Sequence, residues 1–565
     1  MRRVIKFLPL TIIVAAVIAF VYYSVRNFEK SFIENSLMKI EPVFLAVTFI
    51  GILSFIFLNR KELINFFRKV PKTTWLLLLG IFVLALILRT AVAPATHRVY
   101  FDEDIYLDIG KEILLRGNGS LCNYGDSQCH EYAFMKWPNA YPTILAGSYA
   151  IFGISETVAF NLVILLGSLS VILIFLLAYV LTENHKISLY ASLIFALIPI
   201  HIMWSATTAS EPVLVFFTLF AAIFLGLSIK TNAWKMHLLG VLSLAFAIQV
   251  RTEGIILLSI FGFMILILDK HRWKKFTEKK FIISWIIFFI LITPYLMHVY
   301  HSSRTENWGA SGPAFAFSYL DKNIPENSQF WFGGGYPNIE HPLLYTILGA
   351  TGILLAFVLK DNKKKFAYFL VLWFFILFML YAFFYAGSVK FGTDVRYTLS
   401  GYVPLAVLAA IGIYELSMIR KKYEKYISLL IVAIILISFY ILYLPTVATP
   451  ADKIEEAKQA RLYHKFVVEE VRKLPQNCYI LAHTPSIYLT EGRNSLQTWY
   501  GQNSAVMDEL FKKTDCIIFD QNVWCNYVPE DALCHYVLNN YNLREINSIS
   551  MHGHTYTMHY VLGRK

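Results

Sequence analysis

About thirteen apolar runs of membrane-spanning length fill most of this sequence and constrain its fold more than any other feature. A hydrocarbon core of about 30 Å is crossed by about 20 helical residues. The composition agrees, because 57% of the 565 residues are hydrophobic and only 16% are charged. The sequence predicts a polytopic α-helical membrane protein with runs at approximately 7–24, 41–58, 74–93, 155–182, 187–205, 210–229, 236–250, 254–269, 281–299, 342–360, 366–387, 396–418 and 427–446.

The Lys and Arg residues gather in short clusters between these runs and set the orientation. The clusters RKELINFFRK, KTNAWK, KHRWKKFTEKK, KDNKKK and IRKKYEK all fall on one side, which the positive-inside rule assigns to the cytoplasm. They account for the net charge of +12, so nucleic acid is not an expected partner. We expect a multi-pass protein of the cell membrane, in contact with membrane lipid.

One apolar stretch, 236–269, is interrupted by Arg251, Thr252 and Glu253 and is too long for one upright helix. A single span would place KHRWKKFTEKK and every later basic cluster on the outer side. The sequence therefore favours two short helices that meet at Arg251–Glu253 near the outer face.

All six cysteines fall outside the cytoplasm in this topology, where an oxidising compartment allows disulfides. Short spacing pairs four of them and leaves two at the heads of predicted strands: Cys122 with Cys129, Cys525 with Cys534, and the remaining Cys478 and Cys516.

The chain divides into three parts on this basis. Residues 1–70 hold two N-terminal spans, and 71–446 form a membrane core with outer loops at 94–154 and 302–341. For residues 447–565 the sequence predicts a small extracytoplasmic α/β domain. Its predicted strands are CYILAH, SIYLT, DCIIFD and two late segments, and its predicted helices are NSAVMDELFKK and PEDALCHYVLNN.

Unusual polar residues converge on the predicted outer face. They follow the third run or lie in outer turns: Asp102, Glu103, Asp104, Glu211, Arg251, Glu253, Arg396 and Tyr397. Singly, each has an ordinary role as a solvated loop residue, a helix cap or a headgroup anchor. Together they predict a site, because charges near a bilayer are costly.

A transporter or lipid flippase is the alternative interpretation. It requires charges at mid-depth in the membrane, and no charged residue lies near the middle of a firmly assigned run. The gathering of the charges at one face therefore favours an enzyme.

Nucleotide sugars and ATP are scarce outside the cytoplasm, so transfer chemistry there takes a donor carried by the membrane. A polyprenyl-phosphate sugar fits, because its leaving phosphate is already charged and is stabilised by a cation such as Arg396 or Arg251. A carboxylate beside the acceptor hydroxyl takes its proton during attack on the anomeric carbon. Adjacent acids such as Asp102 and Glu103 are alternatively ligands for a divalent metal ion.

Four sequence pieces carry a resemblance to a known family. They are FDED after the third run, the return segment KWPNAYPTILAGSYAIFG, the acidic turn SEP, and RYTLSGYVP. Together they resemble the GT-C membrane glycosyltransferases of the protein O-mannosyltransferase and aminoarabinose transferase branch. The resemblance covers about 94–418 and makes the first two spans an addition to the family core. Asp104 extends the usual acidic pair, and KWPN stands where many relatives carry adjacent prolines.

The resemblance implies a dolichyl- or undecaprenyl-phosphate sugar as donor and a hexose or pentose as the transferred group. It implies Asp102 as the catalytic carboxylate, Glu103 as its partner, Glu211 as a second acid and Arg396 at the lipid phosphate. Arg251 is the weaker candidate for that phosphate, and a protein, a lipid or a glycan remains open as acceptor. The oligosaccharyltransferase branch fits less well, since the chain has no WWD-type motif.

Overall fold

The structure is a computed structural model. It describes residues 8–123, 131–305, 313–333, 340–358, 363–390, 394–454, 458–522, 525, 532–551 and 554–565.

The chain forms two compact units that do not follow simple sequence blocks. The helical unit comprises Met1–Thr96, Lys136–Tyr141 and Phe160–Ala451. The sheet unit comprises His97–Met135, Pro142–Ala159 and Asp452–Lys565. The predicted loop 94–154 therefore packs largely with the C-terminal segment, whereas the sequence suggested a separate loop and domain.

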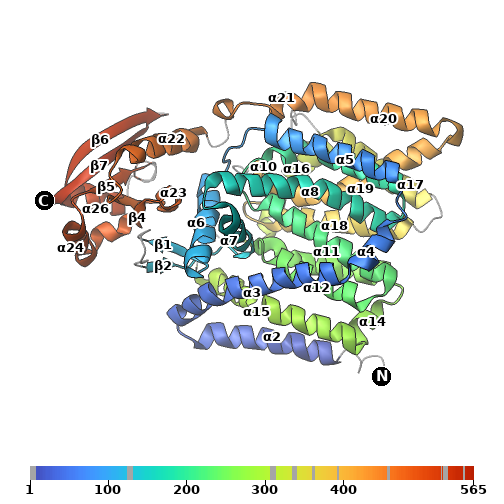
Figure 1. Cartoon of the computed structure of the whole chain (residues 1–565), viewed down its shortest axis with the longest axis horizontal. Coiled ribbons are helices and arrows are strands. Elements are labelled where there is room, and N and C mark those ends of the chain that lie inside the picture. Colours follow the sequence, from blue (N-terminus) through green and yellow to red (C-terminus); the bar gives the residue numbers. More distant parts are fainter. Residues whose placement is uncertain are drawn as a thin grey trace. The chain divides into compact units, whose positions relative to one another are not determined.

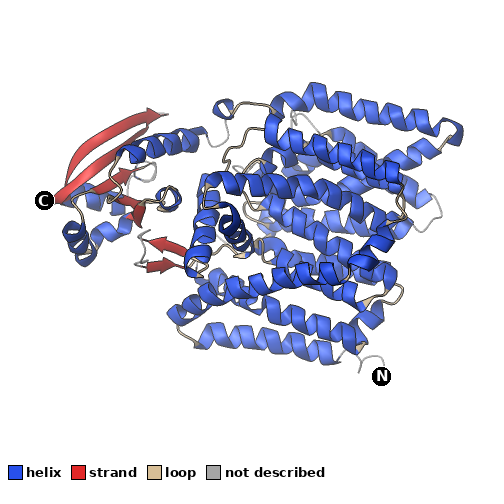
Figure 2. Cartoon of the chain, viewed as in Figure 1, coloured by secondary structure: helices blue, strands red, loops and turns tan. Residues whose placement is uncertain are grey.

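As far as the described residues reach, the predicted apolar runs fold as helices, which confirms the polytopic helical class (Figures 1 and 2). In the described part of the chain, eight helices are long and apolar enough to cross a membrane. A ninth is formed if α9 and α10, bent by 63°, count as one span, and four shorter apolar helices remain. The number of spans thus stays a prediction. The helices in these spans, with the bent pair α9 and α10 included, are α3 (Lys30–Leu58), α5 (Lys72–Ile87), α8 (Glu156–Thr182), α9 (His185–Ala196), α10 (Pro199–Ser205), α11 (Glu211–Thr231), α15 (Lys279–Thr305), α18 (Lys363–Phe383), α19 (Tyr402–Met418) and α20 (Glu424–Ser438).

The shorter apolar helices confirm the predicted break in 236–269. They are α2 (Leu8–Asn27), α12 (Trp234–Ile248), α13 (Ile256–Leu268) and α17 (Leu343–Val358). A 3-10 turn, Thr252–Ile255, separates α12 from α13. Gly254 allows this turn, because a Cβ there would lie 2.4 Å from the carbonyl oxygen of Ile248. The turn fixes the backbone that presents Arg251.

Helices α17 and α19 show how small residues bring two apolar helices together. A Cβ at Gly352 would lie 2.1 Å from Leu408 O, and a Cβ at Gly412 would lie 2.1 Å from Leu348 O. In a membrane, apolar side chains gain little by leaving lipid for another helix, so the hydrophobic effect does not hold two helices together. Close backbone approach of this kind supplies the missing attraction through van der Waals packing.

A buried carboxylate lies inside α3, which corrects the expectation that no charge lies well within a span. Glu41 begins the predicted run 41–58, but α3 starts earlier, at Lys30. Glu41 Oε1 lies 2.8 Å from His298 Nδ1 on α15, and its Oε2 accepts from Asn139 Nδ2 at 2.7 Å. Helix α3 is thereby joined to the return segment and to α15.

The sheet unit is built on five strands in the order β4-β3-β5-β7-β6. Strand β3 (Tyr479–Ala482) pairs in parallel with β4 (Asn494–Gln497) and β5 (Ile517–Gln521). The antiparallel pairs β5–β7 and β7–β6 complete it, with β6 at Tyr541–Met551 and β7 at His554–Arg564. This arrangement confirms a small α/β domain.

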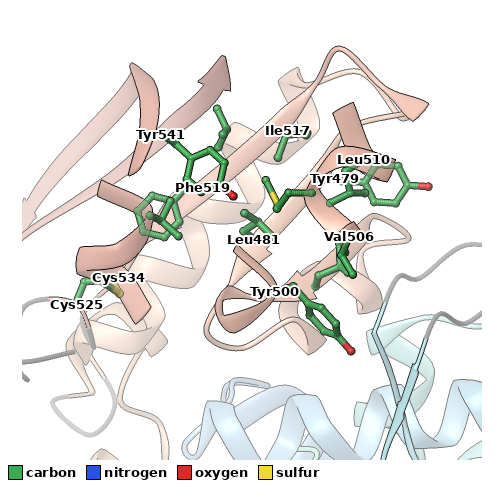
Figure 3. Packing of buried hydrophobic residues seen from close by; sticks show 14 residues of the cluster. Tyr479, Leu481, Tyr500, Val506, Leu510, Ile517, Phe519, Cys525, Cys534 and Tyr541 are labelled. Carbon is green, nitrogen blue, oxygen red and sulfur yellow. A yellow bond between two sulfur atoms is a disulfide. The ribbon is translucent and has the colours of Figure 1, made fainter. Parts of the chain in front are cut away.

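Both faces of this sheet are buried. Leu481 and Phe519 point to one face, where they pack with residues of α24 (Ser504–Lys513) and α26 (Ala532–Asn540) (Figure 3). Ile480 and Ile518 point to the other face and pack beside α22 (Lys458–Lys473). Alternate side chains of an apolar strand thus serve two separate cores, as in sheets covered on both sides.

Other elements of the sheet unit come from the predicted outer loop. Helix α6 (Tyr100–Arg116) is followed by the β1–β2 hairpin (Leu121–Asn123 and Glu131–Ala133) and α7 (Ala140–Phe152). Gly110 brings α6 onto the α7 segment, since a Cβ there would lie 2.9 Å from Leu145 Cβ.

The predicted strand SIYLT is wrong. Ser486–Thr490 forms a short helix, α23, that begins directly after Pro485. A short apolar run does not distinguish strand from helix by periodicity. The strand position beside β3 is taken by β4, whose four residues Asn494–Gln497 carry too little apolar pattern to be recognised.

Two predicted disulfides are present, Cys478–Cys516 and Cys525–Cys534. The first joins the heads of the neighbouring strands β3 and β5. Cys122 is also disulfide-bonded, while Cys129 lies outside the described residues.

We predict that Gly412→Ala destabilises the helical unit by about 1–3 kcal/mol, because the new methyl group meets the backbone of α17. Gly262→Ala is the matched control in α13, since nothing lies within 4 Å of its Cβ position. Thermal unfolding of the purified protein in detergent measures the difference. Equal melting temperatures for the two variants would contradict this packing.

Candidate active site

In the helical unit the structure brings together five of the predicted site residues. Glu211 opens α11 and is followed by Pro212 in the first turn. This placement follows from the sequence, since proline suits the first turn of a helix and a carboxylate is stabilised there by the helix dipole. Only 4% of the Glu211 surface is exposed.

Arg251 is the central cation of this group. Its Nη1 donates to Glu211 Oε1 at 2.5 Å and to Ser210 Oγ at 2.9 Å. Its Nε pairs with Glu253. The hydroxyl of Tyr295 on α15 donates to the carbonyl oxygens of Arg251 (3.2 Å) and Thr252 (3.0 Å), which holds the backbone of the turn.

Arg396 approaches the same carboxylate from the 3-10 helix Asp394–Gly401. Its Nε lies 3.1 Å from Glu211 Oε1, and its guanidinium is buried. The guanidinium carbons of Arg251 and Arg396 lie 5.5 Å and 5.3 Å from the centre of the Tyr397 ring. Tyr397 thus presents one aromatic ring to both cations, a favourable cation–π arrangement.

The five side chains form a nearly closed charge network. Two carboxylates face two guanidiniums, and one of them, Glu211, is shared. Charges taken out of water in this way require partners. Arginines held in place by fixed carboxylates suit recognition of a phosphate group, whose oxygens match the guanidinium geometry.

A small pocket lies beside this network in the helical unit. Its wall includes Tyr397 and Tyr381, whose rings stack with centroids 5.0 Å apart. The remaining lining is mostly aromatic and aliphatic and comes from α18, the segment before α19, and α16 (Leu320–Phe332), including Trp331, Phe374, Leu377 and Phe378.

The acidic triplet opens α6 in the sheet unit, and its three members differ in environment. Asp102 is partly exposed, whereas Glu103 and Asp104 are buried. Glu103 Oε1 accepts hydrogen bonds from the backbone N–H groups of Arg98 and Val99, each at 2.9 Å. Asp102 is therefore the most exposed member of the triplet, and Glu103 binds the N–H groups that precede the helix.

His97 bridges two carboxylates beside the triplet. Its Nδ1 lies 2.6 Å from Glu103 Oε2, and its Nε2 pairs with Glu156. Burial alone would lower the pKa of His97, but the adjacent carboxylates, above all Glu103, raise that pKa well above its usual value. Burial acts against Glu103 too, yet the cationic His97 lowers the pKa of Glu103 to about 2. His97 is thus an imidazolium that donates from both ring nitrogens.

Two further acids line the buried side of α6. Burial raises the pKa of Asp104 to about 8 and that of Asp108 to about 7. The sequence offered a signal for them, because Asp104 and Asp108 are four residues apart and share a helix face. They are protonated over part of the neutral range.

The prediction that Asp102 and Arg396 line one pocket concerns two separate units and stays a prediction. So do the individual roles assigned to the site residues. The alternative metal role of Asp102 and Glu103 stays a prediction as well. Among the described residues, no group of three or more His, Cys, Asp or Glu side chains is arranged for a metal ion.

Sequence reasoning missed a further buried cation in the helical unit. Arg89 lies in a π-helical turn, Leu88–Val92, at the end of the third run. Its Nη2 donates to His201 Nδ1 at 2.9 Å, so the proton of His201 is on Nε2. A lone arginine inside an apolar run was the available signal.

The chain matches one family model by sequence and several solved structures by fold. Residues 136–298 match the family model described as dolichyl-phosphate-mannose-protein mannosyltransferase. This stretch includes Glu211, Arg251 and Glu253 but neither FDED nor RYTLSGYVP. No curated protein matches the chain by sequence.

Solved structures share the fold at low sequence identity. The archaeal oligosaccharyltransferase AglB from Archaeoglobus fulgidus, in complex with an inhibitory peptide and a dolichol-phosphate, matches with a TM-score of 0.52 and 11% identity over 88% of this chain and 75% of that chain. ArnT from Cupriavidus metallidurans, bound to undecaprenyl phosphate, matches with a TM-score of 0.50 and 12% identity over 87% of this chain and 98% of that chain.

The fold is therefore that of the GT-C membrane glycosyltransferases. Within that class, the matched segment 136–298 is similar to the dolichyl-phosphate-mannose-protein mannosyltransferases, which confirms the resemblance seen in the sequence motifs.

We predict that Glu211→Gln lowers the stability of the helical unit by about 3 kcal/mol, because two buried guanidiniums lose their shared carboxylate. Glu424→Gln, in the more exposed pair with Lys186, is the matched control and should change stability by less than about 1 kcal/mol. Both glutamates lie in the first turn of a helix. Equal losses in chemical or thermal unfolding would show that the buried network contributes no more than a surface pair.

The buried acids of α6 predict a pH dependence of stability. The pKa of Asp104 rises from 3.8 to about 8, so the folded state binds more protons than the unfolded state between these values. Stability of the sheet unit therefore falls as pH rises through that window. Asp104→Asn should remove part of the slope and stabilise the unit at pH 8 by an amount on the order of 2 kcal/mol.

The control for this prediction is Asp508→Asn on α24, where the aspartate is exposed. Thermal unfolding followed at several pH values between 4 and 8 tests both variants. An unchanged slope in Asp104→Asn would mean that Asp104 is ionised in the folded protein.

Proposed function

We propose that this protein is a glycosyltransferase that moves one sugar from a polyprenyl phosphate to an acceptor hydroxyl on the extracytoplasmic side of the membrane. The observation that carries the proposal is the buried network in which Arg251 and Arg396 share Glu211, within a GT-C fold. AglB and ArnT are described in complex with dolichol-phosphate and undecaprenyl phosphate, respectively. A lipid phosphate is the corresponding ligand for the two guanidiniums here.

The proposed reaction is a single displacement with inversion. The acceptor oxygen attacks the anomeric carbon of the sugar while Asp102 takes the hydroxyl proton. The bond between the anomeric carbon and the phosphate oxygen breaks, and its electron pair leaves with the polyprenyl phosphate. The arginine pair stabilises the charge on that phosphate, so the leaving group needs no acid.

The chain segment that carries Asp102 leaves and re-enters the helical unit at two points, each fixed by hydrogen bonds within that unit. This segment leaves the helical unit after Thr96, whose N–H donates to Ala206 O at 3.1 Å. The chain returns at Lys136–Tyr141, where Ala140 N–H donates to Gln249 O and Tyr141 OH donates to Thr208 O. Both anchor points therefore lie on the loops that carry Glu211 and Arg251.

Separate observations support the proposed acceptor and the proposed side of the membrane. AglB is described with an inhibitory peptide, and the matched family model names a protein acceptor. We therefore favour a protein hydroxyl over a lipid or a glycan. The basic clusters and the disulfides support an extracytoplasmic location for the sheet unit.

Incubation of the purified protein with a panel of radiolabelled polyprenyl-phosphate hexoses and pentoses tests the proposal. We expect loss of label from one donor, and we expect Asp102→Asn to reduce that transfer at least about a thousandfold, because the acceptor loses its base. Asp321→Asn, an exposed aspartate in the first turn of α16, is the matched control and should retain full activity. Turnover of no donor would refute the proposed function, and full activity of Asp102→Asn would remove Asp102 from the mechanism.

A further inference from the structure

The C-terminal segment contacts the helix that carries the acidic triplet at both ends of that helix. At the N-terminal end, the ring of His464 on α22 lies 6.0 Å from the ring of His97 and 5.1 Å from that of Tyr100. At the other end, Lys111 Nζ donates to Leu489 O at 2.5 Å, where the short helix α23 ends. All these residues belong to the sheet unit.

The contacts at His97 and Tyr100 affect the orientation of Asp102, because these residues are close to Asp102 in the chain. Asp102 lies two residues after Tyr100 and directly before Glu103, whose carboxylate is held by His97 and by the N–H groups of Arg98 and Val99. In a helix, the direction of one side chain is fixed by the backbone that its neighbour anchors. A shift of His97 therefore turns Asp102, and His464 packs against the ring of His97.

We propose that the C-terminal segment is a positioning element for the acid helix, and that His464 is its principal positioning residue. This inference rests on the proposed function, since it concerns the aim of Asp102. His464 touches no reacting atom. It acts through His97 and Tyr100, and a misplacement of about 1 Å at a catalytic group is enough to cost a large factor in rate.

The electrostatic setting fits a neutral packing role for His464 at neutral pH. Burial, followed by the charge of His97, lowers the pKa of His464 to about 4. The acidic groups that face this pair come from two directions, Glu103 and Asp104 on α6 and Glu156 at the start of α8. A permanent positive charge at position 464 would repel the imidazolium of His97 and loosen the start of α6.

Three substitutions in the full-length protein separate ring packing from charge. His464→Phe keeps an aromatic ring and should retain transfer activity within about threefold. His464→Ala removes the ring, and His464→Lys introduces a fixed charge; both should lower kcat about tenfold or more while KM for the donor changes less than about twofold. His559→Ala, a histidine of the same unit that hydrogen-bonds Gln521, is the control and should behave as the unsubstituted protein.

A second measurement reads the structure directly. Hydrogen exchange of the amides of Arg98 and Val99 should speed up in His464→Ala, because their acceptor Glu103 becomes mobile, while exchange in β3 and β5 stays unchanged.

The possible results distinguish a failure of the proposed function from a failure of the positioning proposal. If the unsubstituted protein turns over no donor, the proposed function fails. If it does and His464→Ala keeps its kcat and its exchange rates, only the positioning proposal is overturned. Faster exchange throughout the sheet unit would also overturn it, since His464 would then be needed for folding alone.

Discussion

One carboxylate, that of Glu211, organises the charged centre of the helical unit. Two guanidiniums that are distant in sequence lie within 3.1 Å of the same oxygen, Oε1. A buried arginine without an anion is costly, so each arginine depends on Glu211 for its place in an apolar environment. The turns around Gly254 and the Asp394–Gly401 segment are arranged to deliver these side chains. A phosphate that entered here would join an existing network, and the arginines would not need to be ordered afresh on binding.

The sheet unit uses an opposite arrangement around His97. There one cation lies between two carboxylates, and two backbone N–H groups saturate Glu103. As a result, the three carboxylates of the acidic triplet have different environments. Glu103 is committed to structure and Asp104 is buried with a raised pKa, which leaves Asp102 as the partly exposed carboxylate. The geometry therefore favours one base rather than an acidic pair, although the sequence motif presents two neighbouring acids.

Sequence pattern predicted the helices well, because apolar runs of this length have one stable form in a membrane. It also predicted the gathering of Glu211, Arg251 and Arg396, since each follows or opens a helix at the same predicted face. Sequence pattern did not predict the residue pairs that only the tertiary structure brings together. Glu41 was taken for the edge of a span because nothing in the sequence marks the earlier start of α3. The SIYLT segment became a helix because its neighbour β4 occupies the strand position.

The separation of acids and arginines into two units has a chemical consequence. The proposed reaction needs a base at the acceptor and cations at the leaving phosphate, and each requirement is met within a unit whose own charges are already paired. At the two anchor points, where the chain leaves and re-enters the helical unit, Thr96, Ala140 and Tyr141 form hydrogen bonds with Ala206, Gln249 and Thr208 of the same unit. Asn139 ties the second anchor to Glu41 of α3. Helix α3 is thus joined by a buried polar contact to the point at which the chain re-enters the helical unit.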